Sequence, residues 1–357
     1  MSRLDVAAYV AELDAVLEQP LPWEALSGKT VALSGATGMI GSFLTDVLMR
    51  GNEVRGLGLQ VVALGRSEDK ARERLPHFGR DDFRFVTCDV CALDAAVLPQ
   101  ADFLLHLASS THPRQYSANP IGTIRANVDG LTGMLEWASA SREAGREGRL
   151  VFTSSVEVYG ENRGDVERFD EGYLGYIDCN TLRACYTESK RVGEALCQAW
   201  RAQRGVEAVI ARIARVYGPT LQGDDSKALS QFMHRSLAGE SVVLKSAGTQ
   251  RYSYLHVADA ASGLLWVLLA GDDGEAYNLA DGASDVRLRD LAALVAEAGG
   301  VDVELGEPDA AEAAGFSKAT VALMDGGKAR ELGWRARYDI ADGIAETLAI
   351  MREMGTR

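Results

Sequence analysis

The amino-acid sequence predicts an α/β fold in which a doubly wound parallel sheet is joined to a smaller annex. Short apolar runs, typical of buried parallel strands, alternate with stretches of helical spacing between residues 30 and 213. The first run, residues 31–33, leads into three glycines and then into an apolar stripe with helical spacing. The length of 357 residues suits one large domain with such an annex.

The glycines after the first run, Gly35, Gly38 and Gly41, predict a dinucleotide site. Glycine lets the backbone turn sharply off a strand and approach a pyrophosphate closely. The helix that follows offers free N–H groups and a partial positive charge to the phosphates. A plain turn is the alternative, because a glycine triplet alone is weak evidence. The predicted cofactor contacts in this loop also include Thr37, Met39 and Ile40.

The second buried strand, residues 60–64, is followed by Arg66. NAD-binding sites of this kind usually place an acid near the end of this strand, where it binds the ribose 2′-hydroxyl. An arginine suits the 2′-phosphate of NADP instead, unless Arg66 is a solvated loop residue. The sequence therefore predicts a bound NAD(P) with a lean toward NADP, and NAD is the alternative.

Three further strands and a long helix complete the predicted sheet. The strands cover residues 83–90, 102–109 and 150–155, and the helix covers residues 121–139. We expect Asp89 to meet the adenine, whereas His106 lies within an apolar run and is predicted to be a core residue. The other predicted contacts on these segments are Val90, Leu107, Ala108, Ser109 and Asn127 for the cofactor, and Ser110 for the substrate.

The residues that predict chemistry begin at the end of the fifth strand. Ser155 ends that strand, and Tyr186 and Lys190 lie four apart in a predicted helix, so they share one face. A lysine ammonium beside a phenol favours the phenolate and lowers the pKa of the tyrosine. Tyr186 can then exchange a proton with an alcohol or ketone while Ser155 binds the reacting oxygen. The spacing also arises by chance, but its place after a glycine loop favours catalysis.

Composition and charge exclude several other classes of protein. The formal net charge of −14 argues against nucleic-acid binding as the main function. The five cysteines show no metal-type spacing, so we predict no metal site and a reduced, cytoplasmic protein. No apolar run is long enough to cross a membrane. Ahead of the first strand, residues 6–17 predict an amphipathic helix that packs on the body of the protein or on a second subunit.

These motifs together make the sequence similar to the extended short-chain dehydrogenases/reductases of the NAD-dependent epimerase/dehydratase family. The similarity extends over roughly residues 27–350 and includes further family motifs that begin at Tyr217, His256, Ala276 and Leu332. It implies a nucleotide diphosphate sugar as substrate, with a UDP-sugar favoured, and a tightly bound cofactor. It also implies a homodimer joined through the helices that contain Asn127 and Tyr186.

The resemblance also implies a division of the chain. An N-terminal helical extension, residues 1–26, precedes a Rossmann-like NAD(P)-binding domain, residues 27–218, which also includes residues 250–282. A smaller C-terminal substrate-binding lobe is then formed by residues 219–249 and 283–357.

Within the family, the segment from Arg183 to Arg191 is most similar to UDP-glucuronate decarboxylases. Glu157 stands for their strand-end glutamate, and Val156 replaces the aspartate with which hexose 4,6-dehydratases protonate the departing hydroxyl, so dehydration is disfavoured. The resemblance implies that Tyr186 takes the proton of the sugar C4 hydroxyl, after which the 4-keto intermediate loses carbon dioxide or epimerises. Glu157 is expected to adjust that second step, unless it makes only a structural hydrogen bond.

Two positions depart from the family pattern near the substrate. Arg215 stands where the relatives have asparagine, near the sugar or diphosphate. In a later strand Tyr252 fills the place of the family's arginine, and Arg251 lies one position early, which turns it to the opposite face. We therefore expect Arg215 to bind the anionic part of the substrate, with Arg251 and Tyr252 as the other candidate contacts.

Two other functions remain open. An NADPH-dependent ketone reductase with a non-nucleotide substrate is favoured by Arg66 and disfavoured by the C-terminal lobe. An inactive cofactor-binding protein is disfavoured by the intact Ser155, Tyr186 and Lys190.

Overall fold

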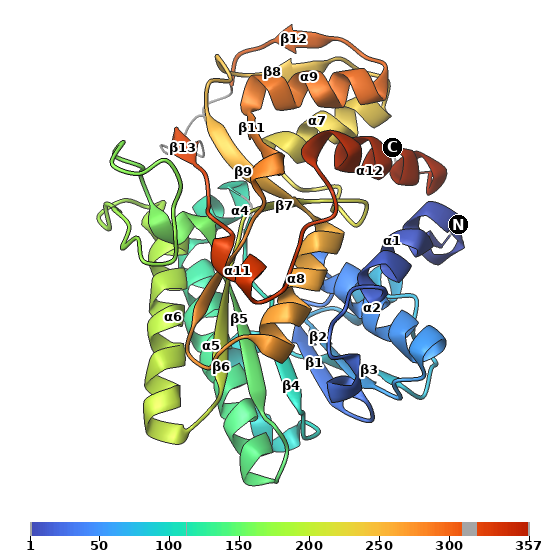
Figure 1. Ribbon diagram of the computed structural model, residues 1–357, viewed down its shortest axis with the longest axis vertical. Coiled ribbons are helices and arrows are strands. Elements are labelled where there is room, and N and C mark those ends of the chain that lie inside the picture. The colour runs from blue at the N-terminus through green and yellow to red at the C-terminus, as the bar shows by residue number, and fades with distance from the viewer. Residues whose placement is uncertain (1, 112, 309–319, 356–357) are drawn as a thin grey trace.

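The computed structural model describes residues 2–111, 113–308 and 320–355 (Figure 1). A layer of parallel strands lies between helices, and a smaller group of helices and strands sits above it in the figure. Residue 1 of the predicted N-terminal extension, and residues 309–319 and 356–357 of the predicted C-terminal lobe, lie outside the described residues.

A seven-stranded parallel sheet forms the centre of the molecule, which confirms the predicted doubly wound fold. Its strand order is β10-β6-β5-β4-β1-β2-β3, so the direction of winding reverses between β1 and β4. Ligands of such sheets bind at this reversal, outside the carboxyl ends of the strands. The strands span Thr30–Ser34 (β1), Gln60–Gly65 (β2), Phe83–Thr87 (β3), Phe103–His106 (β4), Arg149–Ser155 (β5), Ala208–Ile213 (β6) and Ala276–Leu279 (β10).

Two strands are shorter than the sequence predicted. β3 ends at Thr87, because the Asp89 side chain accepts from the Cys91 N–H and begins a 3-10 turn, Val90–Ala92. β4 ends at His106, and residues 107–111 continue as a loop. The apolar runs persist beyond both strands because the loops at this edge still pack against neighbouring elements.

Alternate side chains of the strands enter two separate cores. Val31 and Leu33 pack with the helices α1, α2 and α8, whereas Ala32 faces the opposite core, which α5 and α6 cover. Among the described helices none is both long and apolar enough to span a membrane. The helices of this domain span Ala7–Leu17 (α1), Met39–Arg55 (α2), Glu68–Arg74 (α3), Pro113–Ala118 (α4), Pro120–Glu143 (α5), Ala184–Arg204 (α6) and Val257–Ala270 (α8).

The chain leaves the large sheet after β6 and builds the upper lobe of Figure 1. There β9 lies between β11 and β13 and also pairs with β7, while β8 pairs with β12. The chain returns to the large sheet through α8 and β10. The lobe elements span Arg215–Tyr217 (β7), Ala228–Leu237 (α7), Val242–Leu244 (β8), Arg251–His256 (β9), Asp285–Arg287 (β11), Leu288–Gly299 (α9), Val303–Leu305 (β12), Val321–Ala322 (β13) and Ile340–Glu353 (α12). The short helix α11, Gly327–Glu331, lies below the lobe in Figure 1 and packs against β10 of the large sheet.

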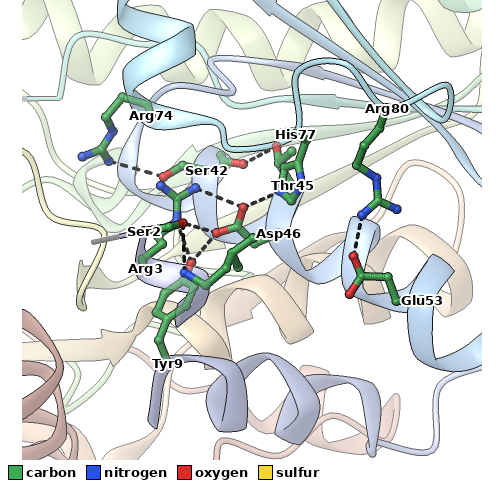
Figure 2. A network of polar contacts seen from close by, with 12 residues as sticks. Ser2, Arg3, Tyr9, Ser42, Thr45, Asp46, Glu53, Arg74, His77 and Arg80 are labelled. Carbon is green, nitrogen blue, oxygen red and sulfur yellow. Dashed lines mark hydrogen bonds and ion pairs between the residues drawn. The ribbon is translucent and has the colours of Figure 1, made fainter. Parts of the chain in front are cut away.

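The N-terminal segment packs on the body of the same chain, which decides between the two placements that the sequence allowed. Helix α1 contacts α2 and α8, and a buried polar network ties the segment to α2 (Figure 2). Asp46 of α2 accepts from Arg3 at 2.5 and 3.0 Å, from the Tyr9 hydroxyl at 2.6 Å, and contacts His77 Nε2 at 2.7 Å. The segment is therefore part of the folded core.

Candidate active site

A cavity of about 700 Å³ lies at the carboxyl ends of the central strands and extends to the C-terminal lobe. It brings together the glycine loop after β1, the end of β2, the loop after β4, the end of β5 and the start of α6. Three predicted contact residues, Asn127, Arg251 and Tyr252, are not part of its lining. All the others line it: Gly35, Thr37, Gly38, Met39, Ile40, Gly41, Arg66, Asp89, Val90, Leu107, Ala108, Ser109, Ser110, Ser155, Glu157, Tyr186, Lys190 and Arg215.

The glycine loop is built too tightly for any larger residue. Gly35 has a φ of 69°, and a Cβ there would lie 2.7 Å from the Ala108 backbone nitrogen. A Cβ on Gly41 would clash with the Gly35 carbonyl. Gly38 caps α2, whose first turn lines the cavity. This close packing of strand, loop and helix leaves backbone N–H groups available for a diphosphate.

The end of β2 presents basic rather than acidic side chains to the cavity. Gly65 ends the strand, and Arg66 and Lys70 both line the cavity. Lys70 Nζ donates to Gln222 Oε1 at 3.2 Å, which connects this region to the C-terminal lobe. Sequence inspection alone did not single out Lys70 or Gln222.

The lobe segment 219–227 crosses the edge of the glycine loop. Thr220 Oγ1 donates to the Met39 carbonyl at 2.9 Å, and Gln222 Nε2 donates to the Thr37 carbonyl at 3.2 Å. Farther along, Lys227 Nζ donates to Thr111 Oγ1 at 3.4 Å on the other side of the cavity. The segment therefore connects both rims of the predicted cofactor site.

Several buried polar atoms at or beside the cavity have no partner within the described part of the protein. They are Ser109 Oγ, Thr153 Oγ1 and Asn127 Oδ1. Asn127 lies behind the lining, where its Nδ2 donates to Ser189 Oγ at 2.8 Å. Unpaired polar atoms of this kind are costly unless a ligand or water satisfies them. Together with the tight glycine loop they fit a dinucleotide such as NAD(P).

The predicted catalytic group assembles at the other end of the cavity. Lys190 Nζ donates to the Thr153 carbonyl at 2.7 Å and lies 5.9 Å from the centre of the Tyr186 ring. Tyr186 is also hydrogen-bonded to Ser155, whereas the sequence predicted only that Ser155 faces the same crevice. The spacing on α6 and the end of β5 thus bring all three side chains together.

The predicted fall in the pKa of Tyr186 does not occur in this structure. Burial raises the pKa of Tyr186, and the hydrogen bond from Ser155 opposes that rise only in part. Burial also lowers the pKa of Lys190 to about 7, so the lysine is only partly protonated near neutral pH. Desolvation disfavours both charged forms, and it outweighs the attraction that the sequence spacing alone indicates.

A charged cluster lines the cavity beyond Tyr186. Glu157, in the turn after β5, accepts from Arg183 Nη2 and from Arg215 Nη2, each at 3.1 Å. The Arg215 guanidinium lies 4.0 Å from the centre of the Tyr252 ring. Burial opposes ionisation of Glu157, but Arg215 and Arg183 outweigh it and lower the pKa of the carboxyl. Glu157 is therefore ionised, and the three side chains carry a net positive charge.

Two predicted substrate contacts lie outside the cavity lining, and two residues that were not predicted line it. Tyr252 lies beneath Arg215, and Arg251 lies outside the cavity lining on β9, so neither reaches the cavity directly. Arg183 lines the cavity, and its place in the decarboxylase-like segment could have indicated it as a site residue. Tyr116 on α4 stacks on Tyr186 with ring centres 5.8 Å apart, and no local pattern pointed to it.

Comparisons with known proteins agree with this geometry. A family model described as the NAD dependent epimerase/dehydratase family matches residues 31–280. UDP-glucuronic acid decarboxylase 5 of Arabidopsis thaliana is 31% identical, over 89% of this chain and 88% of its own. UDP-glucuronic acid decarboxylase 3 of the same plant is 34% identical, over 68% and 67% of the two chains.

Solved structures show the same fold. A dTDP-glucose 4,6-dehydratase from Streptomyces venezuelae, with NAD and TYD bound, is 26% identical with a TM-score of 0.75, covering 91% of this chain and 97% of its own. A UDP-glucose 4-epimerase from Thermotoga maritima, with UDP-glucose, is 22% identical with a TM-score of 0.77, covering 91% and 99%.

Proposed function

Because this chain belongs to the NAD-dependent epimerase/dehydratase family, we propose that it oxidises the C4 hydroxyl of a UDP-sugar acid and then decarboxylates the 4-keto intermediate. The chain is a nucleotide-sugar enzyme of this family, and the two decarboxylases compared above are 31% and 34% identical to it. The observation that carries the choice of reaction is the charged cluster of Glu157, Arg183 and Arg215 at the sugar end of the cavity.

The glycine loop and the loops after β2, β3 and β4 would hold the cofactor. The first turn of α2 would bind the diphosphate, Asp89 would contact the adenine and Lys190 would lie near the nicotinamide, since all three line the cavity. The oxidised nicotinamide, when bound, would supply a hydride acceptor and a positive charge. The lobe segment 219–227 lies across the glycine loop through Thr220 and Gln222, which supports a tightly held cofactor.

Tyr186 is the proton acceptor for the sugar C4 hydroxyl. The hydrogen bond with Ser155 favours the phenolate, and a protonated Lys190 on the same helix face favours it further. Ser155 also orients the reacting oxygen. Removal of the C4 hydroxyl proton by Tyr186, with the C4 hydride passing to the oxidised nicotinamide that a bound cofactor would supply, would give a 4-ketone. A C6 carboxylate is then a β-keto acid, and its loss of carbon dioxide leaves an enolate that takes a proton at C5.

The guanidiniums of Arg183 and Arg215 fit a substrate carboxylate or diphosphate, because each can donate parallel hydrogen bonds. Glu157 keeps both in place and leaves the cluster with one excess positive charge. Every nucleotide sugar carries a diphosphate, so this charge selects among sugars where it faces C6, at which a carboxylate gains from it and a neutral sugar does not. This arrangement supports a sugar acid over a neutral hexose as substrate.

Incubation of the purified protein with UDP-glucuronate, UDP-glucose and dTDP-glucose, with no reductant added, tests the proposal by product mass. We expect only UDP-glucuronate to react, with loss of carbon dioxide. An unchanged mass with altered chromatographic mobility would indicate epimerisation instead. Loss of water, or activity restricted to a non-nucleotide ketone with added NADPH, would contradict the proposal.

Replacing Arg215 with methionine is expected to weaken binding of UDP-glucuronate by roughly 10- to 100-fold, the scale of a charge-assisted contact. Arg251→Met is the matched control, because Arg251 lies outside the cavity lining and should change affinity little. Calorimetric titration gives the affinities, and the melting temperature shows whether Arg215→Met has damaged the fold. Loss of binding in Arg251→Met alone would overturn this assignment.

Arg66 is proposed to favour NADP over NAD through the 2′-phosphate, since no acid ends β2 and Lys70 adds a second cation nearby. Arg66→Ala should weaken NADP by roughly 10- to 100-fold and leave NAD little changed. Dissociation constants of both cofactors, measured on the stripped protein, check this. Arg72→Ala is the control, because Arg72 pairs with Glu68 on the exposed face of α3. NAD alone in the purified protein would refute the preference.

A homodimer through α5 and α6 is also proposed. Ile121 and Ile124 on α5 and Val192 on α6 are exposed apolar side chains, as is Leu182 just before α6. A second copy of these two helices would cover them.

A further inference from the structure

A buried carboxylate lies one helical turn beyond the proposed catalytic lysine. Glu194 follows Lys190 by four residues on α6, so the two side chains leave the same face of the helix. Its Oε1 accepts from Ser154 Oγ at 2.6 Å and from Arg212 Nε at 3.0 Å. Its Oε2 accepts from Arg212 Nη2 at 2.7 Å. Glu194 and Arg212 lie behind the cavity lining and have no part in the function proposed above.

These contacts tie α6 to the strand that carries the catalytic serine. Ser154 lies between Thr153, whose carbonyl accepts from Lys190 Nζ, and Ser155. The Glu194 contact therefore connects helix and strand at the level of the proposed proton transfer. A shift of α6 along β5 would break the Ser154 contact and the Lys190 contact together.

Arg212 neutralises the carboxylate from the neighbouring strand. It lies on β6 in register with Ser154, and it also donates to the Tyr159 hydroxyl at 2.9 Å and to the Glu171 carbonyl at 3.0 Å. The Glu194 and Arg212 side chains are only 15% and 13% exposed. A buried pair in this setting is neutral as a whole, but each partner exerts a strong field if the other is removed.

The ionisable groups that face Lys190 come from several elements. Tyr186 and Glu194 lie on its own helix, His106 of β4 interacts electrostatically with it, and Arg212 of β6 pairs with Glu194. Burial lowers the pKa of His106 to about 3, so that imidazole is neutral. Burial lowers the pKa of Lys190 to about 7, and the Glu194 charge opposes this. A small change in the charges near Lys190 therefore changes the protonated fraction of that lysine near neutral pH.

We propose that the Glu194–Arg212 ion pair fixes α6 against β5 at the level of Lys190 and, because its two charges cancel, shields that lysine from the field that either partner alone would exert. Both are then positioning residues of the proton-transfer site, since neither lines the cavity. The consequence for catalysis rests on the proposed function of Lys190, whereas the effect on the lysine charge does not.

Removing each partner in turn tests the proposal through the pKa of Lys190, followed by NMR of protein carrying isotope-labelled lysine, with Lys190→Met to identify the signal. Glu194→Gln leaves Arg212 unneutralised and should lower the Lys190 pKa by about one unit or more. Arg212→Gln leaves the carboxylate unneutralised and should raise it by a similar amount. The double variant removes both charges and should return the pKa to near the wild-type value.

The two single variants are expected to shift the Lys190 pKa in opposite directions if the role of the ion pair is electrostatic. A loosened fold would shift the pKa in the same direction in both variants. Glu188→Gln is the control, with no pKa shift expected, because it removes a carboxylate of the same helix that is more than one-third exposed and pairs with Arg191 in contact with solvent. An unchanged Lys190 pKa in folded Glu194→Gln, or shifts of the same sign, would overturn the proposal. If Glu194→Gln does not fold, the rise in Arg212→Gln and its reversal in the double variant decide the matter.

The pH profile of turnover gives a second measurement. Its alkaline limb should move to lower pH in Glu194→Gln and to higher pH in Arg212→Gln, following the lysine charge. If the Lys190 pKa shifts as expected and no nucleotide sugar reacts with the wild-type protein, the proposed function fails and the role of the ion pair stands.

Discussion

Replacement of Tyr186 with phenylalanine is expected to reduce turnover of UDP-glucuronate by roughly 100-fold or more, the usual scale for a general acid–base group. The phenol is the group that can take the C4 proton beside Ser155, and phenylalanine keeps the ring that stacks on Tyr116. The fold and the bound cofactor should be unchanged, because the substitution removes a single hydroxyl.

Steady-state turnover, cofactor content and melting temperature together check this expectation. Tyr176→Phe is a matched control, because Tyr176 is 54% exposed and lies outside the cavity lining. Near-normal turnover of Tyr186→Phe with an unchanged melting temperature would remove Tyr186 from the mechanism. Because burial raises the pKa of Tyr186, the wild-type rate should also increase with pH until Lys190 loses its proton.

The largest expected loss of stability comes from Asp46→Ala. This substitution leaves the Arg3 guanidinium, the Tyr9 hydroxyl and His77 without their shared partner in a buried site (Figure 2). Removing one partner of a buried charged pair costs about 3–5 kcal/mol in free energy of unfolding. Urea unfolding followed by circular dichroism measures the loss.

Asp14→Ala is the matched control for the same helix pair. Asp14 of α1 binds Arg50 of α2 at 2.8 Å, but both side chains are about one-third exposed. Such pairs contribute about 0–1 kcal/mol, so this variant should unfold close to the wild type. Equal losses in Asp14→Ala and Asp46→Ala would show that the buried network adds nothing beyond a surface contact.

The contribution of Asp46 should also depend on pH in a defined direction. Burial opposes its ionisation, but Arg3 and His77 outweigh burial and lower the pKa of the carboxyl in the folded state. A group with a lowered folded pKa stabilises the protein above its unfolded pKa of about 4, and this stabilisation is lost as the pH falls. The difference between wild type and Asp46→Ala should therefore shrink in acid.

Local sequence patterns were sufficient for the fold and for most of the cavity. Buried parallel strands appear in the sequence as continuous apolar runs. The spacing of the glycines indicates a close approach of loop and helix, so the tight positions Gly35 and Gly41 were predictable from the sequence. The four-residue spacing of Tyr186 and Lys190 is a property of any helix, so their shared face was also predictable. These signals depend only on neighbouring residues.

Features that depend on burial or on residues far apart required the tertiary structure. The pKa of Tyr186 was predicted with the wrong direction, because sequence spacing gives the charge of Lys190 but not the desolvation of both groups. The Glu157 cluster joins a turn after β5, the start of α6 and β7, and no single segment contains it. The sequence by itself thus determined which elements form and brought Ser155, Tyr186 and Lys190 forward as the candidate catalytic group, whereas only the folded chain decided their charge states, because desolvation depends on everything that packs around them.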